Sequence, residues 1–296
     1  MQANEQIRLG LVGTGAWGLK YLPATEEATG VVLTHVASPN ARQKTFPASV
    51  EVHEDWRDLL TLGLDGLIVA TPPDTHAGIT RAALEAGLAV LVEKPVTSNA
   101  DDARALLDMA RSKKAILQVG HIDLQNPALV AVLDQLPQHQ DIKQVAGGWS
   151  NAGPWRDDAE PLWDWGPHPL ACALRVTDFD NTQMTASIEE VGQGRLYHMQ
   201  GDFGGVDVDL TFGNGSTKRQ RWMEISTVDH VFRYDDDVDD KAKCDDKSLD
   251  YAKTPALTAQ VERFADSIRQ GGQDTLDAEL ALEVIKLLER IEKLTI

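Results

Sequence analysis

A glycine-rich turn lies between an apolar run and a helical segment near the start of the chain. Residues 7–12 read IRLGLV, and Gly13-Thr14-Gly15-Ala16-Trp17-Gly18 follows directly, at the start of a predicted helix over 16–27. In such a strand, turn and helix, the first glycine permits the tight turn, the second lets a pyrophosphate approach the backbone, and the third allows close helix packing. The helix N-terminus adds the positive end of its dipole. The six residues of this motif are therefore predicted to bind a dinucleotide, with an ordinary turn as the alternative.

The chain up to residue 121 alternates between predicted strands and helices. The predicted strands are residues 7–12, 31–38, 65–72, 89–95 and 115–120, and the predicted helices are residues 16–27, 55–63, 76–87 and 98–114. This alternation is typical of an α/β fold with a doubly wound parallel sheet of the Rossmann type, in which ligands bind at the carboxyl ends of the strands. Residues 1–121 are predicted to form this dinucleotide-binding domain.

After residue 121 the pattern changes to strands without helices between them. The predicted strands are residues 144–150, 184–192, 196–203, 206–212, 220–227 and 230–235, and two amphipathic helices over 257–270 and 276–294 close the chain. The pattern favours an α+β domain over 122–296 with an open, mostly antiparallel sheet. The last helix is expected to pack back on the first domain. One face of the sheet should then be uncovered and apolar, which predicts a homodimer or homotetramer.

The overall charge and hydropathy exclude several classes of partner. The 296 residues carry a formal net charge of −18, which argues against electrostatic affinity for nucleic acid or for an anionic membrane. No apolar run approaches the roughly 18 residues expected of a membrane span. The N-terminal residues show no secretion signal, so we expect a cytoplasmic protein.

Neither the cysteines nor the acidic run predicts a metal site. Cys172 and Cys244 are too few for a disulfide framework and lack companions at zinc spacing. Residues 235–250 contain eight aspartates in sixteen positions, but this run has Asp240 and Asp246 where a calcium loop needs glycine and glutamate. We predict a solvated acidic loop, with a metal site as the alternative.

The end of the second predicted strand bears on the choice between NAD and NADP. An acidic residue there would bind the ribose 2′-hydroxyl and repel a 2′-phosphate. The segment Ser38-Pro39-Asn40-Ala41-Arg42 has no carboxylate and includes a cation. Ser38 and Arg42 are therefore predicted to contact the cofactor, and they favour NADP, with an ordinary surface arginine as the alternative.

Two further strands end in polar residues at the edge where the dinucleotide is expected. The first is followed by Thr71-Pro72-Pro73-Asp74-Thr75-His76, and the other ends in Glu93-Lys94-Pro95. A lysine at such a strand end can point its ammonium group at a substrate oxygen. A capped turn and a solvated ion pair are the alternatives. The predicted cofactor contacts are Thr71, Pro72, His76, Glu93 and Lys94.

Residues 161–170, PLWDWGPHPL, place Asp164 and His168 four positions apart. If this stretch is helical, the two side chains lie on one face and can touch. The imidazole can exchange a hydroxyl proton near neutral pH, and the carboxylate can orient it and support its charged form. A capping aspartate and a structural histidine are the alternative. Trp163 and Trp165 either line a sugar site or pack.

The sequence resembles the glucose-fructose oxidoreductase / inositol dehydrogenase / MocA (Gfo/Idh/MocA) family. The resemblance rests on four elements that occur in this order: GLVGTGAWG, ATPPDTH, EKPVT and the Asp164-x-x-x-His168 element. The resemblance implies an N-terminal Rossmann domain and a C-terminal α/β domain whose open sheet often mediates dimers or tetramers. It also implies oxidation or reduction of a sugar, nucleotide-sugar or cyclic polyol with NAD(P), and Lys94, Asp164 and His168 as the catalytic set. The alternative is a dinucleotide-binding regulatory protein of the same fold without turnover; retention of the catalytic set argues against it.

The chain departs from the family after Gly120-His121. Many members continue with glutamate, arginine, phenylalanine, asparagine and proline, whereas here the run is Ile122-Asp123-Leu124-Gln125-Asn126-Pro127, with Leu124 and Gln125 at the arginine and aromatic positions. The resemblance therefore does not carry over a particular substrate. The predicted substrate contacts are His121, Arg156 and Trp163, and each has packing or a surface ion pair as its alternative.

Overall fold

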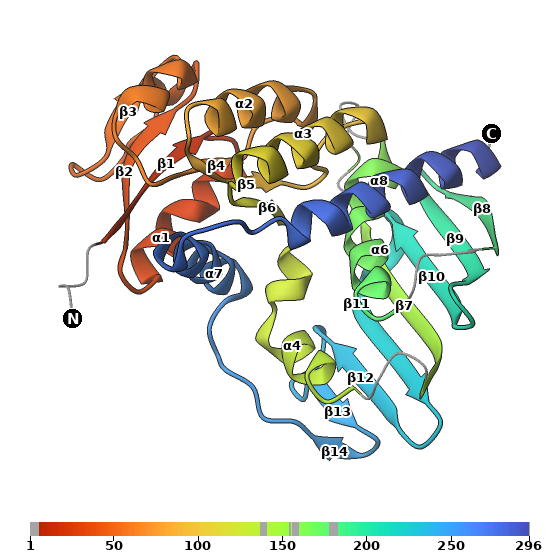
Figure 1. Ribbon diagram of the computed structural model, residues 1–296. Coiled ribbons are helices and arrows are strands. Elements are labelled where there is room, and N and C mark those ends of the chain that lie inside the picture. Colours follow the sequence, from red (N-terminus) through yellow and green to blue (C-terminus); the bar gives the residue numbers. More distant parts are fainter. Residues whose placement is uncertain (1–5, 137–140, 154, 156–159, 178–182, 296) are drawn as a thin grey trace. The chain divides into compact units, whose positions relative to one another are not determined.

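The computed structural model describes residues 6–136, 141–153, 155, 160–177 and 183–295 (Figure 1). The chain forms two compact units. The first contains residues 1–122 and 254–282, and the second contains residues 123–253 and 283–296. The segment 254–282 thus belongs to the first unit, although it follows residues 123–253 of the second unit in the sequence.

A six-stranded parallel sheet forms the centre of the first unit. Its strand order is β3-β2-β1-β4-β5-β6. The strands are β1 Ile7–Val12, β2 Val31–Ala37, β3 Glu51–His53, β4 Gly66–Val69, β5 Ala89–Glu93 and β6 Leu117–Gly120. Every residue of β4, β5 and β6 is buried, as expected of parallel strands covered on both faces. This order is that of the doubly wound dinucleotide-binding fold, and the predicted Rossmann sheet is confirmed.

Helices cover both faces of this sheet. They are α1 Tyr21–Glu27, α2 Pro73–Glu85, α3 Ala100–Lys113 and α7 Ala256–Gln270, with short 3₁₀ helices η1 Gly18–Lys20, η2 Ala41–Gln43 and η3 Trp56–Thr61. Helix α2 packs against α3 and α1 packs against α7 (Figure 1). Phe264 of α7 reaches the core, where a Cβ atom on Gly66 would lie 2.9 Å from its ring. The return segment 254–282 therefore supplies part of the core of the first unit.

Two helix starts show why the bounds differ from those expected. Helix α2 begins three residues before the predicted start, at Pro73, because a proline at the first helical position has no N–H group to leave unpaired. Helix α3 begins at Ala100, where the side chain of Asn99 accepts a hydrogen bond from the backbone N–H of Asp102 at 2.8 Å. Arg111 and Lys113 lie in its last turn, as the helix dipole favours.

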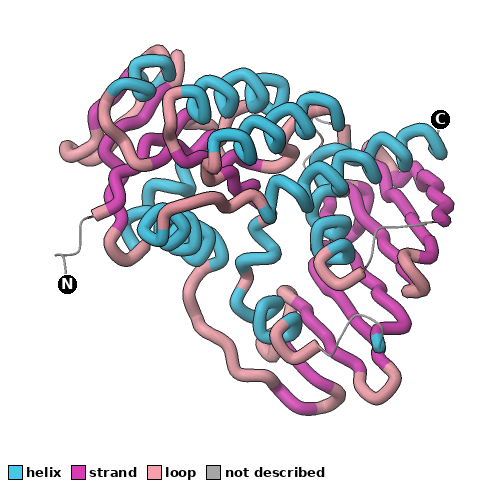
Figure 2. The backbone as a smooth tube through the Cα atoms, in the orientation of Figure 1, coloured by secondary structure: helices cyan, strands magenta, loops and turns pink. Residues whose placement is uncertain are grey.

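The second unit contains an eight-stranded sheet with the order β14-β13-β12-β11-β7-β10-β9-β8. Strands are drawn in magenta in Figure 2. The strands are β7 Ile142–Ala152, β8 Gln183–Val191, β9 Gly194–Asp202, β10 Asp207–Gly213, β11 Gly215–Thr227, β12 Val231–Asp235, β13 Ala242–Cys244 and β14 Lys247–Ser248. All neighbouring pairs are antiparallel except β7 and β10, which run parallel. The predicted open, mostly antiparallel sheet is confirmed.

Short helices of the second unit pack on one face of this sheet. They are η4 Ile122–Gln125, α4 Pro127–Leu133, α5 Pro161–Trp165 and α6 Pro167–Leu174, and α8 Leu276–Thr295 begins in the first unit and ends in the second. Helix α6 contacts β7 and β10, α5 contacts β9 and β10, and α4 contacts β12 and β13. Buried residues such as Trp149, Leu210 and Phe212 fill the space beneath them. The helices between residues 127 and 174 were not predicted, apart from the conditional helix at PLWDWGPHPL.

The other face of the sheet is polar, which corrects the expected apolar face. Alternate strand residues point to it, and many of them pair across strands. Nε2 of Gln200 donates a hydrogen bond to Oδ2 of Asp209 at 2.8 Å, and Nε2 of His198 lies 3.2 Å from Oε2 of Glu189. Arg233 forms an ion pair with Glu224 on the neighbouring strand. Cross-strand polar pairs therefore occupy much of the face that the described helices leave uncovered.

The acidic run at 235–250 also differs from its prediction as a solvated loop. It contains β13 and β14 and is held by ion pairs. Asp236 accepts from Lys241 at 2.9 Å and from Arg219 at 2.5 Å, and Lys243 lies 3.1 Å from Asp240. These pairs hold Asp236 and Asp240, and the segment forms a short hairpin edge instead of an open loop.

Among the described residues, the structure contains no helix that is both long enough and apolar enough to cross a membrane.

Candidate functional site

The glycine turn joins β1 to the helical segment that follows it. Gly13 has a φ of +97°, and a Cβ atom there would lie 2.2 Å from the carbonyl oxygen of Ala70. A Cβ atom on Gly18 would lie 2.1 Å from the carbonyl oxygen of Gly13. At Gly15, by contrast, a Cβ atom would meet nothing within 4 Å. The fold thus requires the first and third glycines, whereas the second faces open space.

This arrangement fits a dinucleotide. The open space at Gly15 would let a pyrophosphate approach the main chain. Thr14 is buried, whereas Ala16 and Trp17 are exposed beside Gly15. The N–H group of Gly13 donates to the carbonyl oxygen of Ala37 at 2.9 Å, which holds the turn against the end of β2. Of the six predicted residues, Gly13, Thr14 and Gly18 form the inside of the turn. Gly15, Ala16 and Trp17 form its exposed surface.

Glu93, at the end of β5, is tied to this turn. Its Oε1 accepts hydrogen bonds from Trp17 Nε1 at 2.5 Å and from the hydroxyl of Tyr21 at 2.6 Å. Its Oε2 accepts from the backbone N–H of Lys94 at 3.2 Å. Burial raises the pKa of Glu93, although these hydrogen bonds and the charge of Lys94 oppose the change. Glu93 therefore joins the glycine turn to the segment that carries Lys94, which is half-buried and precedes a cis proline.

His76 joins the two other segments predicted to bind the cofactor. It is buried, with Nδ1 2.8 Å from the carbonyl oxygen of Pro95 and Nε2 2.8 Å from that of Thr71. Burial lowers its pKa, while the two carbonyl groups act in the opposite direction. Pro72 is the N-cap residue of α2, and the Thr71 hydroxyl accepts from Thr75 at 2.7 Å. His76 thus links the start of α2 to the turn after β5.

The segment after β2 carries two cations near its end. Arg42 is exposed and lies 3.5 Å from Glu54. Lys44 donates to the carbonyl oxygen of Thr14 in the glycine turn and lies 3.3 Å from its hydroxyl. The Ser38 hydroxyl donates to Asn40 at 2.8 Å. Lys44 was not predicted, because it lies two residues beyond Arg42, yet its ammonium group contacts the turn.

The second unit holds His168 in a buried cluster of charged groups. Nδ1 of His168 lies 2.6 Å from Oδ2 of Asp123, and Arg221 donates from its guanidinium to Oδ1 of the same carboxylate at 2.9 Å. The side chains of His168 and Asp123 are 10% and 5% exposed. His168 comes from α6, Asp123 from η4 and Arg221 from β11. Three separate elements therefore converge on one carboxylate.

The charge of Asp123 determines how the imidazole is protonated. Burial alone would raise the pKa of Asp123, but the charges of His168 and Arg221, with the hydrogen bond from His168, outweigh it and hold the pKa well below its usual value. An ionised carboxylate only accepts hydrogen bonds, so Nδ1 of His168 must be the donor. The neutral ring then carries its lone pair on Nε2, the atom that can exchange a proton.

The remaining predicted residues are placed as follows. Asp164 is half-buried on α5, and Gly166 lies between α5 and α6 with helical backbone angles. Trp163 is half-buried and donates from Nε1 to Glu292 of α8 at 3.2 Å, so its polar edge faces that helix. His121 is buried after β6. Arg156 lies outside the described residues.

The sequence alone did not predict Asp123 and Arg221 as site residues. Asp123 is 45 residues from His168 and 98 from Arg221, so no local spacing connects them. One signal was present: Asp123 occupies the acidic position of the run after Gly120-His121 that many family members show as glutamate. The family resemblance thus marked a carboxylate there.

Comparison with known proteins identifies the family of the first domain. Residues 7–121 match the model of the GFO_IDH_MocA oxidoreductase family, described as having an NAD-binding Rossmann fold. This segment of the chain belongs to that family. The relatives of the chain include UDP-N-acetylglucosamine 3-dehydrogenase of Acidithiobacillus ferrooxidans, 26% identical over 88% of each chain. They also include 4-carboxy-2-hydroxymuconate-6-semialdehyde dehydrogenase of a Sphingobium species, 29% identical over 97% of this chain and 98% of that one.

Similarity to a solved structure extends over both units. A crystal structure from Magnetospirillum magnetotacticum, named as a candidate oxidoreductase, is 29% identical in sequence with a TM-score of 0.85. The alignment covers 96% of this chain and 99% of that one. The similarity therefore extends over both units, and the chain is an oxidoreductase.

Proposed function

We propose that this protein transfers a hydride between NAD(P) and the hydroxyl-bearing or carbonyl carbon of a sugar, nucleotide-sugar or cyclic polyol. The observation that carries the proposal is the 2.6 Å contact between His168 Nδ1 and the buried Asp123 carboxylate. Such a contact fixes the imidazole tautomer and stabilises the imidazolium, as a general acid–base requires. UDP-N-acetylglucosamine 3-dehydrogenase, the relative named above, supports the substrate class.

In this proposal each group has a distinct role. His168 Nε2 takes the proton of the reacting hydroxyl during oxidation and returns it during reduction. Asp123 is a positioning residue, and Arg221 keeps it ionised. Lys94 stabilises negative charge on the reacting oxygen, and Asp164 completes the catalytic set that the family resemblance implied. The bound nicotinamide supplies the site that accepts or donates the hydride.

A panel of ligands tests the substrate class. Thermal unfolding should be followed with saturating dinucleotide and with nucleotide-sugars, cyclic polyols or a semialdehyde acid. A semialdehyde belongs in the panel because one full-length relative is named for such a substrate. A ligand at 100 times its dissociation constant adds about 2.7 kcal/mol of stability. Stabilisation by the semialdehyde alone would contradict the proposed class. Dinucleotide binding without turnover of any ligand would favour the regulatory alternative.

We propose that NADPH binds at least as tightly as NADH. No carboxylate follows β2, and Arg42 and Lys44 place positive charge on the segment that should meet the ribose 2′-position. Arg42→Ala and Lys44→Ala should weaken NADPH binding more than NADH binding, because only NADPH carries the extra phosphate. Titration by nicotinamide fluorescence measures both affinities. A clear wild-type preference for NADH would show that this interpretation of the segment is wrong.

We also propose self-association as a homodimer or homotetramer through the uncovered sheet face. Although that face is largely polar, non-obligate interfaces are about as polar as other surfaces, and tryptophan is often central in them. Trp222 of β11 lies over Gly148, where a Cβ atom would come within 2.5 Å of its indole nitrogen. Light scattering at micromolar concentration should show an oligomer, and Trp222→Glu should shift it toward monomer. A strictly monomeric wild type would contradict the proposal.

A further inference from the structure

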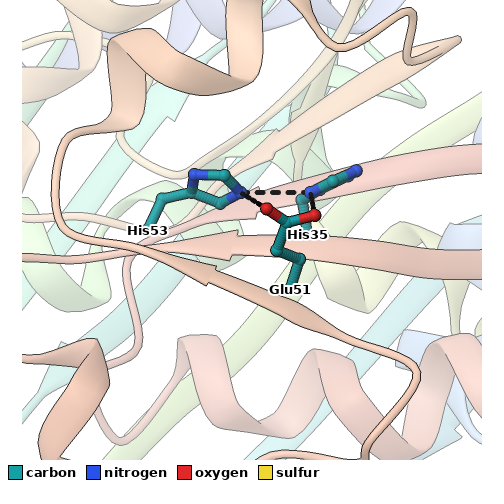
Figure 3. Close-up of side chains that lie close together, drawn as sticks. All are labelled: His35, Glu51 and His53. Carbon is teal, nitrogen blue, oxygen red and sulfur yellow. Dashed lines mark hydrogen bonds and ion pairs between the residues drawn. The ribbon is translucent and has the colours of Figure 1, made fainter.

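Two histidines and a glutamate meet at the edge of the parallel sheet in the first unit. Strand β3 is the edge strand and pairs with β2, with His35 opposite Glu51 and Ala37 opposite His53. Because side chains alternate between faces along a strand, Glu51 and His53 point to the same face, and His35 points there with its partner Glu51. Figure 3 shows the three side chains converging on one point.

The distances within this cluster match those of a metal ligand set. His35 Nδ1 lies 3.1 Å from His53 Nε2, and each of these nitrogens lies 3.8 Å from a carboxylate oxygen of Glu51. Bonds of 2.0–2.1 Å in tetrahedral geometry would place ligand atoms about 3.3 Å apart. The two 3.8 Å distances end on different oxygens of Glu51, Oε2 for His35 and Oε1 for His53. One ligand atom from each of the three residues lies within 4.8 Å of the other two, so small side-chain rotations would bring the three atoms to the spacing of one face of a zinc coordination sphere.

A hydrogen bond between the two imidazoles explains only part of this geometry. It accounts for the 3.1 Å contact, but it leaves both Glu51 oxygens beyond hydrogen-bond distance although the carboxylate faces both rings. Glu51 is exposed, with 68% of its side chain accessible, and its two oxygens lie within ion-pair distance of the two rings. A shared cation would account for all three positions.

The surroundings of the cluster favour a metal as well. The imidazole side chains are largely buried, with 9% of His35 and 12% of His53 accessible, so little rotamer freedom is left to lose on binding. Behind His53, its second nitrogen Nδ1 lies 3.6 Å from Asp58 Oδ2. A carboxylate behind a ligating histidine orients the ring and raises its basicity.

We propose that His35, His53 and Glu51 bind one Zn²⁺ ion, with solvent completing the coordination on the exposed side of Glu51. Two imidazoles and a carboxylate are suitable zinc ligands. The ion would clip the edge strand β3 to β2. His53 also accepts, through its carbonyl oxygen, a hydrogen bond from the N–H of Ser38 at 3.1 Å, so the clip would hold the segment after β2 in place. This site revises the expectation that the protein has no metal site.

Zinc titration of the tag-free, chelator-treated full chain tests the proposal. A second group, His230, Cys244 and Asp245, also has ligand atoms close together, so the titration is done in a Cys244→Ser, His230→Asn background. Calorimetry should give one Zn²⁺ per chain, and Zn²⁺ should raise the unfolding temperature. Co²⁺ in place of Zn²⁺ should give the visible absorption of a tetrahedral complex.

Three variants in this background separate a metal site from a surface charge effect. Glu51→Gln and His53→Gln should each weaken Zn²⁺ binding by at least about tenfold, since the loss of even an outer-shell partner typically costs 10–100-fold. Glu54→Gln removes a neighbouring exposed carboxylate and should leave the affinity unchanged. Far-ultraviolet circular dichroism without metal checks that each variant folds, and Glu51→Gln is the surest to do so because its side chain is exposed. No binding in the background protein, or equal affinity in Glu51→Gln and Glu54→Gln, would overturn the proposal.

Discussion

Replacing His168 by alanine should lower turnover by about 10² to 10⁴-fold, the usual contribution of a positioned acid or base. Dinucleotide affinity should be nearly unchanged, because in the proposed reaction His168 acts on the substrate, whereas the glycine turn holds the dinucleotide. Lys94→Ala should reduce turnover to a similar extent, with some loss of dinucleotide affinity, since Lys94 follows Glu93 at the edge of the turn. Steady-state rates with a substrate from the ligand panel, together with dinucleotide titrations, measure both effects. Wild-type turnover in His168→Ala would mean that the histidine is structural.

The carboxylate that supports His168 can be identified by two matched variants. Asp123→Asn should lower turnover by about 10²-fold or more, as loss of an orienting carboxylate does elsewhere. It should also move the acidic limb of the pH–rate profile to lower pH, because loss of the negative charge favours the neutral imidazole. Asp164→Asn should also impair turnover while the protein stays folded, but it should move that limb less than Asp123→Asn does, because Asp123 makes the 2.6 Å contact with Nδ1. A limb that moves only in Asp164→Asn would contradict the assignment of Asp123.

Stability must be measured alongside these rates. Removing one partner from a buried charged pair costs about 3–5 kcal/mol, and Asp123→Asn leaves Arg221 without its carboxylate. Asp123→Glu is the control, because it keeps the charge and should restore the acidic limb even if its longer side chain slows turnover. A purely structural role for Asp123 predicts lower stability with an unchanged pH–rate profile.

Gly15→Val should abolish dinucleotide binding while the protein stays folded. A Cβ atom at this position would meet nothing within 4 Å, so we expect the fold to accommodate a side chain there. It would occupy the space that the pyrophosphate needs. Gly18→Val is the informative contrast, since its Cβ atom would lie 2.1 Å from a backbone oxygen and the variant should lose stability first. Fluorescence titration and thermal unfolding separate the two outcomes. Wild-type dinucleotide affinity in Gly15→Val would show that the turn does not hold the cofactor.

Long and strongly patterned elements were predictable from the sequence. Strand β1 and the glycine turn after it were located because an apolar run, three glycines and a helix follow one another within a short segment. Helix α3 was located by its capping residue and its charged ends. Strand β3 was missed because its three residues are polar or half-buried and it forms only by pairing with β2. Short elements of this kind depend on tertiary contacts more than on local pattern.

The candidate site shows the same limit. The glycine turn is a local feature, so its residues could be named from spacing alone. The environment of His168 is not local. The four-residue spacing pointed to Asp164 as the carboxylate beside the imidazole, whereas the hydrogen bond to Nδ1 comes from Asp123, which the fold brings in from a different element. The Arg221 guanidinium arrives from β11, where the sequence shows only an ordinary strand residue.

The formation of reduced nicotinamide in a single turnover tests the central claim most directly. Wild-type protein is loaded with oxidised dinucleotide and mixed with the alcohol that stabilises it most in the ligand panel, and the absorbance of reduced nicotinamide is followed. The account predicts a rapid rise in wild type and a rise slowed by about 10² to 10⁴-fold in His168→Ala. Two negative results together would contradict the account. In the first, wild type binds both ligands but forms no reduced nicotinamide. In the second, wild type mixed with the corresponding ketone and reduced dinucleotide forms no oxidised nicotinamide.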